Sequence, residues 1–360
     1  MRLTVKNIER IWVDLPFREV AHLNMIRVLP HWSILELCKV TLECGTVGIG
    51  ETMPFYTWQE VTDESVARAT GKPASEVRWD DSLGGGLQMA LFDAVARANE
   101  VPVHHLLGEK QRSNAPVSWW SVEMPIEDWI SEAREAVSLG YTNYKMKARP
   151  WFDIFAQVVP ADYKFDLDFN GFLLDAARAE VTLSALDEYP HIDMYESPFY
   201  LYKDLDGARL LRQQTRNSLI EHFGQDCLRA DCCDGFVLGG HPLEIMRQGT
   251  LAAASNKPFW IQHVGTGITT AYVAHLYAVL SHAQLPGITA HELWEHDLLM
   301  ARLDVQNGYL AIPDAPGLGV EIDEKALATC QVDEDHPTHK TRYRRHKRII
   351  EVSWPGAGRK

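Results

Sequence analysis

The 360-residue sequence is short of cysteine, of basic residues and of long apolar runs. Its six cysteines form no C-x-x-C pair, which argues against a disulfide framework and a zinc knuckle. Lysine and arginine number 35 against 49 aspartates and glutamates, and the formal net charge of −14 disfavours binding to nucleic acid or to an anionic membrane. No run approaches the roughly 18 apolar residues of a membrane span. Residues 1–10 lack the apolar core of a signal peptide, so we expect a cytoplasmic protein.

The first third of the sequence has the pattern of a small α+β domain. Between Trp32 and Glu51 apolar and polar residues alternate and glycines interrupt them, which predicts an antiparallel hairpin. From Gly84 to Val101 apolar residues recur at helical spacing and a proline follows, which predicts an amphipathic helix.

After Asn114 eight short β-rich segments alternate with helical stretches. They are APVSWWSVE, YTNYKMK, YKFDLDF, IDMYES, SLIEHF, DGFVLGG, FWIQHV and ITAHELW. Eight strands alternating with helices predict an α/β fold of the parallel (β/α)8-barrel type, whose chemistry lies at the carboxyl ends of the strands. An open doubly wound sheet is the competing architecture, and the absence of G-x-G-x-x-G after the first segment disfavours it.

Two lysines stand in the second segment. Because side chains alternate along a strand, Lys145 and Lys147 share a face and point into one cavity. Two buried ammonium groups need an anion between them. The alternative is an edge strand with both lysines in solvent, which a closed barrel does not offer.

Acidic residues end the next three segments at regular intervals. Asp168 and Glu196 are 28 residues apart, and Glu221, with His222 beside it, follows 25 residues after Glu196. Each interval matches one strand, one helix and two turns, so we expect these groups at neighbouring strand ends. Oxygen ligands from three strands suit Mg²⁺. Taken singly, each acid is more simply explained as a helix cap.

The sixth and seventh segments supply a possible acid/base pair. Asp234 and His263 are 29 residues apart. An aspartate that holds a histidine orients the ring and raises its basicity, which suits proton transfer. The alternative is that His263 is a core histidine whose ring is hydrogen-bonded within the protein.

These residues resemble the enolase superfamily, within it the mandelate racemase and acid-sugar dehydratase branch. The helix LQMALFDAVARANEVPVHHLLGEK resembles the end of that family's capping domain, and K-x-K at Lys145 matches its second-strand motif. D-x-N at Asp168 and Y-E-S-P around Glu196 match its first two metal ligands. Asp234 lies five residues before a Gly-Gly pair, and His263 precedes GTGITTAYVAHL, as the family's dyad residues do.

The resemblance implies a two-part organisation. An α+β capping domain would comprise residues 1–114 joined by 325–360, and residues 115–324 would form the catalytic barrel. The stretch NGYLAIPDAPGLGVEID resembles the family's segment after the barrel, and IIEVSW its return to the capping domain.

The resemblance also implies a chemistry. Mg²⁺ would be held by Asp168, Glu196 and either Glu221 or His222, with oxygen preference favouring Glu221. Lys145 would contact the carboxylate of a small substrate, while Lys147 and the Asp234-oriented His263 would act as acid/base groups on opposite faces. We expect dehydration of an acid sugar to a 2-keto-3-deoxy acid by a homo-oligomeric lyase. Racemisation of a 2-hydroxy acid, and a catalytically silent barrel scaffold, are the alternatives.

The sequence departs from the family pattern in two of its intervals and in its eighth segment. The intervals from Lys147 to Asp168 and from Glu221 to Asp234 are only 21 and 13 residues, so the second and fifth helices must be shortened. In the eighth segment Trp294 stands where mandelate racemase has a glutamate. Glu292 lies on the same face and is the candidate eighth-strand acid, while Glu295 lies on the other face.

Two further segments have possible binding roles. The stretch from Asp14 to Arg27, with Arg18 and His22, is a candidate specificity loop over the barrel mouth, although a solvated hairpin tip fits equally well. The basic run from Arg342 to Arg348 is most simply a solvated face, and an anion-binding or subunit-contact patch is its alternative.

Overall fold

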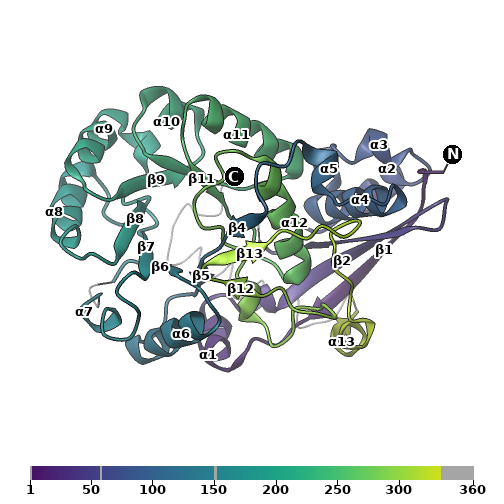
Figure 1. Ribbon diagram of the computed structural model, residues 1–360, viewed down its shortest axis with the longest axis horizontal. Helices are drawn as coiled ribbons and strands as arrows, with labels where there is room; N and C mark the ends of the chain where they lie inside the picture. Colours follow the sequence, from purple (N-terminus) through teal and green to yellow (C-terminus); the bar gives the residue numbers. More distant parts are fainter. Residues whose placement is uncertain (1, 57–58, 150–151, 334–360) are drawn as a thin grey trace.

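The computed structural model describes residues 2–56, 59–149 and 152–333, and the basic run and IIEVSW of the C-terminal tail lie outside them. An antiparallel sheet opens the chain in the order β14-β1-β2-β3, shown at the right of Figure 1. Its strands are β1 (Val5–Asp14), β2 (Ile34–Leu42), β3 (Val47–Thr52) and β14 (Gln331–Val332). The pairing of β2 with β3 confirms the predicted hairpin. The division into capping and barrel domains at the predicted residues stays a prediction.

The predicted amphipathic helix is α4 (Gly85–Ala98), and it lies directly on β3. Two glycines of β3 permit this close approach. A Cβ at Gly48 would lie 2.2 Å from the backbone nitrogen of Ala94, and one at Gly50 would lie 2.1 Å from the carbonyl oxygen of Gly86. Smaller helices surround this pair: α2 (Asp63–Ala69), α3 (Ala74–Val77) and α5 (His104–Leu107).

Replacing Gly50 by alanine is expected to lower the free energy of unfolding by about 2 kcal/mol or more, because the new methyl group would meet helix backbone that cannot rotate away. Chemical denaturation measures this. Gly224→Ala is the matched control, because its nearest atom would be 3.9 Å away, and its effect should stay within about 1 kcal/mol. Equal stability of the two variants would contradict the packing described here.

Seven of the eight predicted barrel strands form one parallel sheet in the order β11-β10-β9-β8-β7-β6-β5. The eighth segment takes part through isolated bridges, because Gly287 pairs with Val117 and Ile288 pairs with Gln262. It thus links the last strand of the sheet to the first, as an eighth barrel strand does. The strands are β5 (Trp119–Trp120), β6 (Asn143–Lys147), β7 (Lys164–Asp168), β8 (Ile192–Glu196), β9 (Ser218–His222), β10 (Gly235–Leu238) and β11 (Phe259–Ile261).

Helices follow the strands and line the outer side of the sheet (Figure 1). They are α6 (Ile126–Ser138), α7 (Phe152–Phe155), α8 (Ala176–Leu186), α9 (Leu205–Gln214), α10 (Gln225–Ala230), α11 (Pro242–Ala254) and α12 (Gly267–Val279). The helices after the second and fifth strands, α7 and α10, have only four and six residues. Both shortened units expected from the sequence are therefore confirmed.

The remaining elements flank the two sheets. Helix α1 (Glu19–Val28) lies beside α6, where Asn24 donates a hydrogen bond to Asp128. A small antiparallel sheet contains β4 (Asn114–Pro116), β12 (Val305–Gln306) and β13 (Tyr309–Ala311), and α13 (Glu324–Cys330) precedes β14.

One face of each barrel strand points into the barrel. Met194, Ile220, Val237, Trp260 and Ile288 form a separate apolar cluster there, with one residue from each of five neighbouring strand segments. Since side chains alternate along a strand, every second residue after these also faces inward. This alternation assigns the side chains at the strand ends to the barrel mouth or to the surrounding helices.

A buried carboxylate joins the antiparallel sheet to the barrel. Glu51 of β3 accepts hydrogen bonds from the amide of Thr266 and the hydroxyl of Thr269, each at 2.7 Å, where α12 begins. Burial raises the pKa of Glu51, and these hydrogen bonds lower it in part. The loop that follows β3 is thereby held beside the carboxyl ends of the barrel strands.

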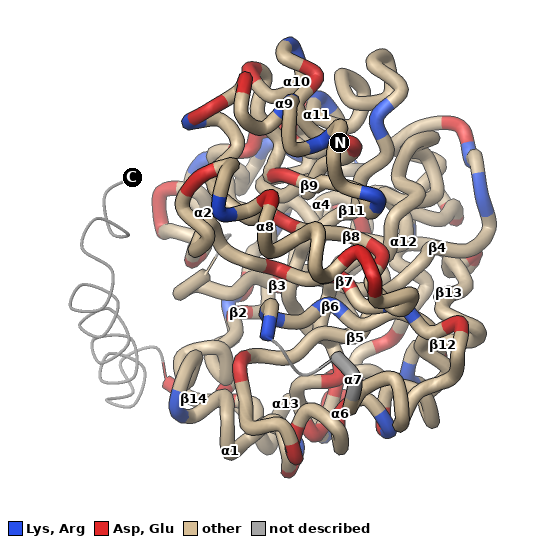
Figure 2. Tube along the Cα trace, turned by 90° about the vertical axis from the view of Figure 1, so that its left-hand side faces the viewer, with Lys and Arg blue, Asp and Glu red and all other residues tan. Residues whose placement is uncertain are grey.

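Charged residues of both signs are interspersed on the side of the molecule seen in Figure 2, and no continuous basic face appears along the described chain in that view. Among the described residues no helix is both long and apolar enough to cross a membrane.

Candidate functional site

A buried ion pair lies at the centre of the barrel mouth. The ammonium of Lys145 on β6 contacts the carboxylate of Glu196 on β8, and each residue is only 2% exposed. Lys145 also donates to Gln262 Oε1 at 2.7 Å and lies 5.2 Å from the ring centre of Trp260. Burial lowers the pKa of Lys145, but the charges of Glu196 and Asp168 outweigh it and the pKa is raised.

A second ion pair lies beside the first. Lys147 Nζ donates to Asp168 Oδ2 at 2.7 Å and also contacts the side-chain oxygen of Asn170. Asp168 Oδ1 accepts the Asn170 amide at 2.9 Å. Because β6, β7 and β8 run in register through Lys147, Asp168 and Glu196, the two lysines and two acids form one cluster.

The fifth strand presents His222 to this cluster, and Glu221, the preferred third metal ligand, lies outside it. His222 Nε2 lies 3.2 Å from Glu196 Oε1. Glu221 points to the opposite face, where it accepts hydrogen bonds from the Ser197 hydroxyl at 2.7 Å and from the amides of Leu201 and His222 at 2.9 and 2.8 Å. Its carboxylate therefore stabilises the loop that follows β8.

The electrostatics of Glu196 follow from its neighbours. Burial raises its pKa, but the Lys145 ammonium and the His222 ring outweigh burial and lower the pKa to about 2. Burial lowers the pKa of His222, and Glu196 reverses this, so that the pKa of His222 is raised. The ionised carboxylate and its cationic neighbours thus stabilise one another.

The predicted Asp234–His263 dyad is not formed. Asp234 immediately precedes β10, at the amino end of that strand, where its carboxylate accepts hydrogen bonds from Arg212 Nε at 2.6 Å and the Leu219 amide at 2.9 Å. His263 follows β11 at the carboxyl end. Since β10 and β11 are parallel, the two residues lie at opposite ends of the barrel.

His263 also faces away from the mouth. Trp260 and Gln262 point into the barrel, so the alternation of the strand turns His263 outward, where Nε2 lies 2.7 Å from the Gly240 carbonyl oxygen. Burial lowers the pKa of His263 to about 3. The expected role as an acid/base group on the second face of the substrate stays a prediction that this geometry does not support.

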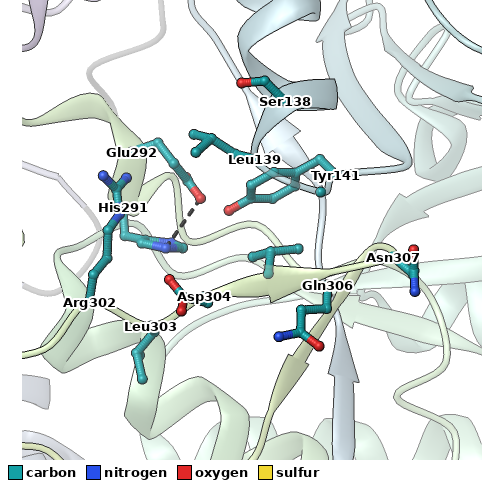
Figure 3. A pocket seen from close by; sticks show the side chains of 12 residues that line it. Ser138, Leu139, Tyr141, His291, Glu292, Arg302, Leu303, Asp304, Gln306 and Asn307 are labelled. Carbon is teal, nitrogen blue, oxygen red and sulfur yellow. Dashed lines mark ion pairs between the residues drawn. The ribbon is translucent and has the colours of Figure 1, made fainter.

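Glu292 does not reach the barrel mouth either. It lines a separate cavity of about 510 Å³ together with the end of α6 and residues 302–307 (Figure 3), and its Oε1 lies 3.2 Å from His291 Nε2. Burial raises the pKa of Glu292 to about 7. The eighth segment forms a short helical turn (His291–Leu293) that contains this residue, and the turn directs its side chain into this cavity.

The candidate specificity loop is instead largely helix α1. Arg18 contacts the buried Glu132 of α6, donates to the Glu292 carbonyl and lies 4.8 Å from the ring centre of Trp119. Arg27 donates to Asn24 at 3.0 Å within α1. Arg18 therefore fastens α1 to the barrel wall.

Aromatic residues that sequence reasoning missed lie near the mouth. The Trp32 ring is 4.5 Å from that of Tyr56 and 5.2 Å from that of Trp120, measured between ring centres. Gln262 Nε2 lies 3.5 Å from the Tyr56 hydroxyl. The sequence signal was a tryptophan just past the candidate loop and a tyrosine just past β3, neither of which carries a recognisable motif.

The family model described as enolase C-terminal domain-like matches residues 128–326, more than half of the chain. The chain belongs to the enolase superfamily. Its relatives place it with the mandelate racemase and muconate lactonizing type. The sequence resemblance to this superfamily is thereby confirmed, and relatives with lyase and isomerase names support an enzyme.

Several curated proteins are similar over most of their length. An o-succinylbenzoate synthase of Geobacillus stearothermophilus is 27% identical, with 81% of this chain and 87% of the relative covered. A chloromuconate cycloisomerase of Cupriavidus pinatubonensis is 25% identical, with 88% and 95% covered. The crystal structure of muconate cycloisomerase from Pseudomonas fluorescens superposes with a TM-score of 0.74 at 22% identity, over 92% of this chain and 99% of that one, which shows the fold.

Enolase-superfamily enzymes generally use Mg²⁺, and the residues of this site do not fit that ion well. The cluster offers two carboxylates and an imidazole in place of three oxygen ligands, and both carboxylates hold ammonium groups. Among the described residues no three histidine, cysteine, aspartate or glutamate side chains converge to hold a metal ion.

The buried Glu292 should make stability depend on pH. The unfolded chain loses this proton near pH 4.5 and the folded chain near 7, so the free energy of unfolding falls as the pH rises between these values. Glu292→Gln cannot ionise and should exceed the wild type at pH 8 by up to about 3 kcal/mol. Urea denaturation at pH 5 and pH 8 measures the difference.

The exposed acid Asp304 lines the same cavity and gives the control for this experiment. Asp304→Asn should leave the pH profile close to that of the wild type. Parallel profiles for Glu292→Gln and the wild type would show that Glu292 is ionised in the folded protein.

Proposed function

We propose that this chain is a lyase that removes the α-proton of a small carboxylate and expels a β-hydroxyl group, with an acid sugar as the substrate class to test first. The observation that carries the proposal is the pairing of Lys145 and Lys147 on one strand, with both ammonium groups in the cluster at the barrel mouth. Glucarate dehydratase of Streptomyces coelicolor, named as probable, and arabinonate dehydratase of Saccharolobus solfataricus are 27% and 25% identical relatives.

Lys147 is the proposed acid/base group. Its side chain is 24% exposed at the mouth, whereas Lys145 is buried beneath it. In its neutral form Lys147 takes the α-proton. The resulting ammonium then protonates the departing β-hydroxyl from the same face of the substrate. These two proton transfers need only one acid/base group, Lys147.

Lys145 is the proposed electrostatic group. Removing a proton next to a carboxylate builds negative charge on the substrate oxygens, and a preorganised cation in a water-poor site stabilises that charge. Lys145 is held in place by Glu196, Gln262 and the Trp260 ring. Its position is therefore set before substrate arrives.

The geometry favours elimination over racemisation. Racemisation needs a second acid/base group on the opposite face of the α-carbon, and the outward orientation of His263 removes the expected one. From β11 the mouth receives the amide of Gln262, which does not transfer protons at neutral pH.

The role of Lys147 is tested by exchange of the substrate α-proton in deuterated water, followed by NMR over a panel of sugar acids and other 3-hydroxy carboxylates. Lys147→Ala should slow exchange by a factor of about 100 or more. His263→Asn is the matched control and should keep the rate within about threefold of the wild type.

Trapping of carbonyl products on the same panel separates the reaction classes. Keto acid formation supports dehydration. Deuterium incorporation with a change in optical rotation and no keto acid would favour racemisation, and exchange lost in His263→Asn but not in Lys147→Ala would refute the assigned roles. A ligand that binds without any exchange would favour the silent scaffold.

A further inference from the structure

Glu221 cannot join the cluster by a simple side-chain rotation. It occupies the outer face of β9, where three hydrogen bonds use both of its oxygens. Because faces alternate along a strand, bringing Glu221 inward requires a one-residue shift of β9. That shift would turn Ile220 out of the barrel cluster and the buried Leu219 into it. The packing of the strand thus keeps a third carboxylate out of the site.

Each carboxylate of the cluster already has a cationic partner. Lys147 pairs with Asp168 and Lys145 pairs with Glu196, so two ammonium groups face two carboxylates. His222 occupies the other oxygen of Glu196. A divalent cation here would add two positive charges beside Lys145, which is 2% exposed, and unpaired charge at such depth is costly.

We propose that this chain lacks the three-oxygen Mg²⁺ centre, and that Lys145, Lys147 and His222 neutralise Asp168 and Glu196 where a cation would otherwise do so. The site therefore keeps its structure and its paired charges without a tightly bound metal. Metal binding can be measured apart from the proposed dehydration, so the test does not depend on finding a substrate.

Metal titrations of the whole protein test this directly. After dialysis against EDTA, isothermal calorimetry with MgCl₂, MnCl₂ and ZnCl₂ should show no site with micromolar affinity. Adding 5 mM MgCl₂, or keeping EDTA present, should change Tm by less than about 1 °C, because weak binding contributes little to stability. Elemental analysis of the protein as purified should find less than about 0.1 metal ion per chain.

A gain-of-binding variant gives the matched comparison. His222→Glu places a third carboxylate on the inner face of β9 beside Glu196. Its Tm should fall in EDTA, because like charges repel, and should recover in MgCl₂, with Mg²⁺ affinity at least about tenfold above that of the wild type. Glu221→Gln keeps the outer hydrogen-bonding position and should leave metal affinity unchanged.

Two results would overturn the proposal. Micromolar Mg²⁺ affinity in the wild type that Glu221→Gln abolishes would mean that β9 shifts and that Glu221 is a ligand. Micromolar affinity for any of the three metals that His222→Asn abolishes would mean that His222 is a ligand. If His222→Glu does not fold, the wild-type titrations and elemental analysis still decide the matter, and neither measurement uses catalysis.

Discussion

The buried pair of Lys145 and Glu196 is the constraint on which the rest of the site depends. Two charges that are each 2% exposed lose their hydration, and attraction repays that loss only if every remaining polar valence is satisfied. Their surroundings are the groups that satisfy this demand. Gln262 and the Trp260 ring hold the ammonium, and His222 holds the second oxygen of Glu196. The charged groups of this pair are thus already held by their neighbours before substrate enters.

The alternation of side chains along a strand explains why adjacent residues of this protein lie on different sides of the barrel wall. On β9 an acid and an imidazole are adjacent, and the apolar residues below them decide which one points inward. Ile220 belongs to the barrel interior, so His222 follows it and Glu221 does not. The same alternation places Gln262 in the mouth and His263 outside it.

Much of the fold was predictable because it rests on local periodicity. The hairpin, the eight β-rich segments and the two shortened helices all follow from spacing along the chain. The failures concern which end or face of a strand a residue occupies. The 29-residue interval pairs Asp234 with His263, but β10 begins only after Asp234, and Arg212 holds its carboxylate. Glu292 does not reach the barrel mouth because a helical turn interrupts the expected strand.

The aromatic residues near the mouth could not be predicted from the sequence, for a different reason. Trp32 and Tyr56 come from the antiparallel-sheet region, and contacts between the two regions, among them the hydrogen bonds of Glu51 and of Trp294, hold them beside Trp120 of the barrel. No periodicity within either region encodes that contact. The Tyr56 hydroxyl lies 3.5 Å from Gln262, which also holds Lys145, so this aromatic cluster adjoins the charged residues of the mouth. The surroundings of the two lysines therefore depend on the contact between the two regions as much as on the barrel strands themselves.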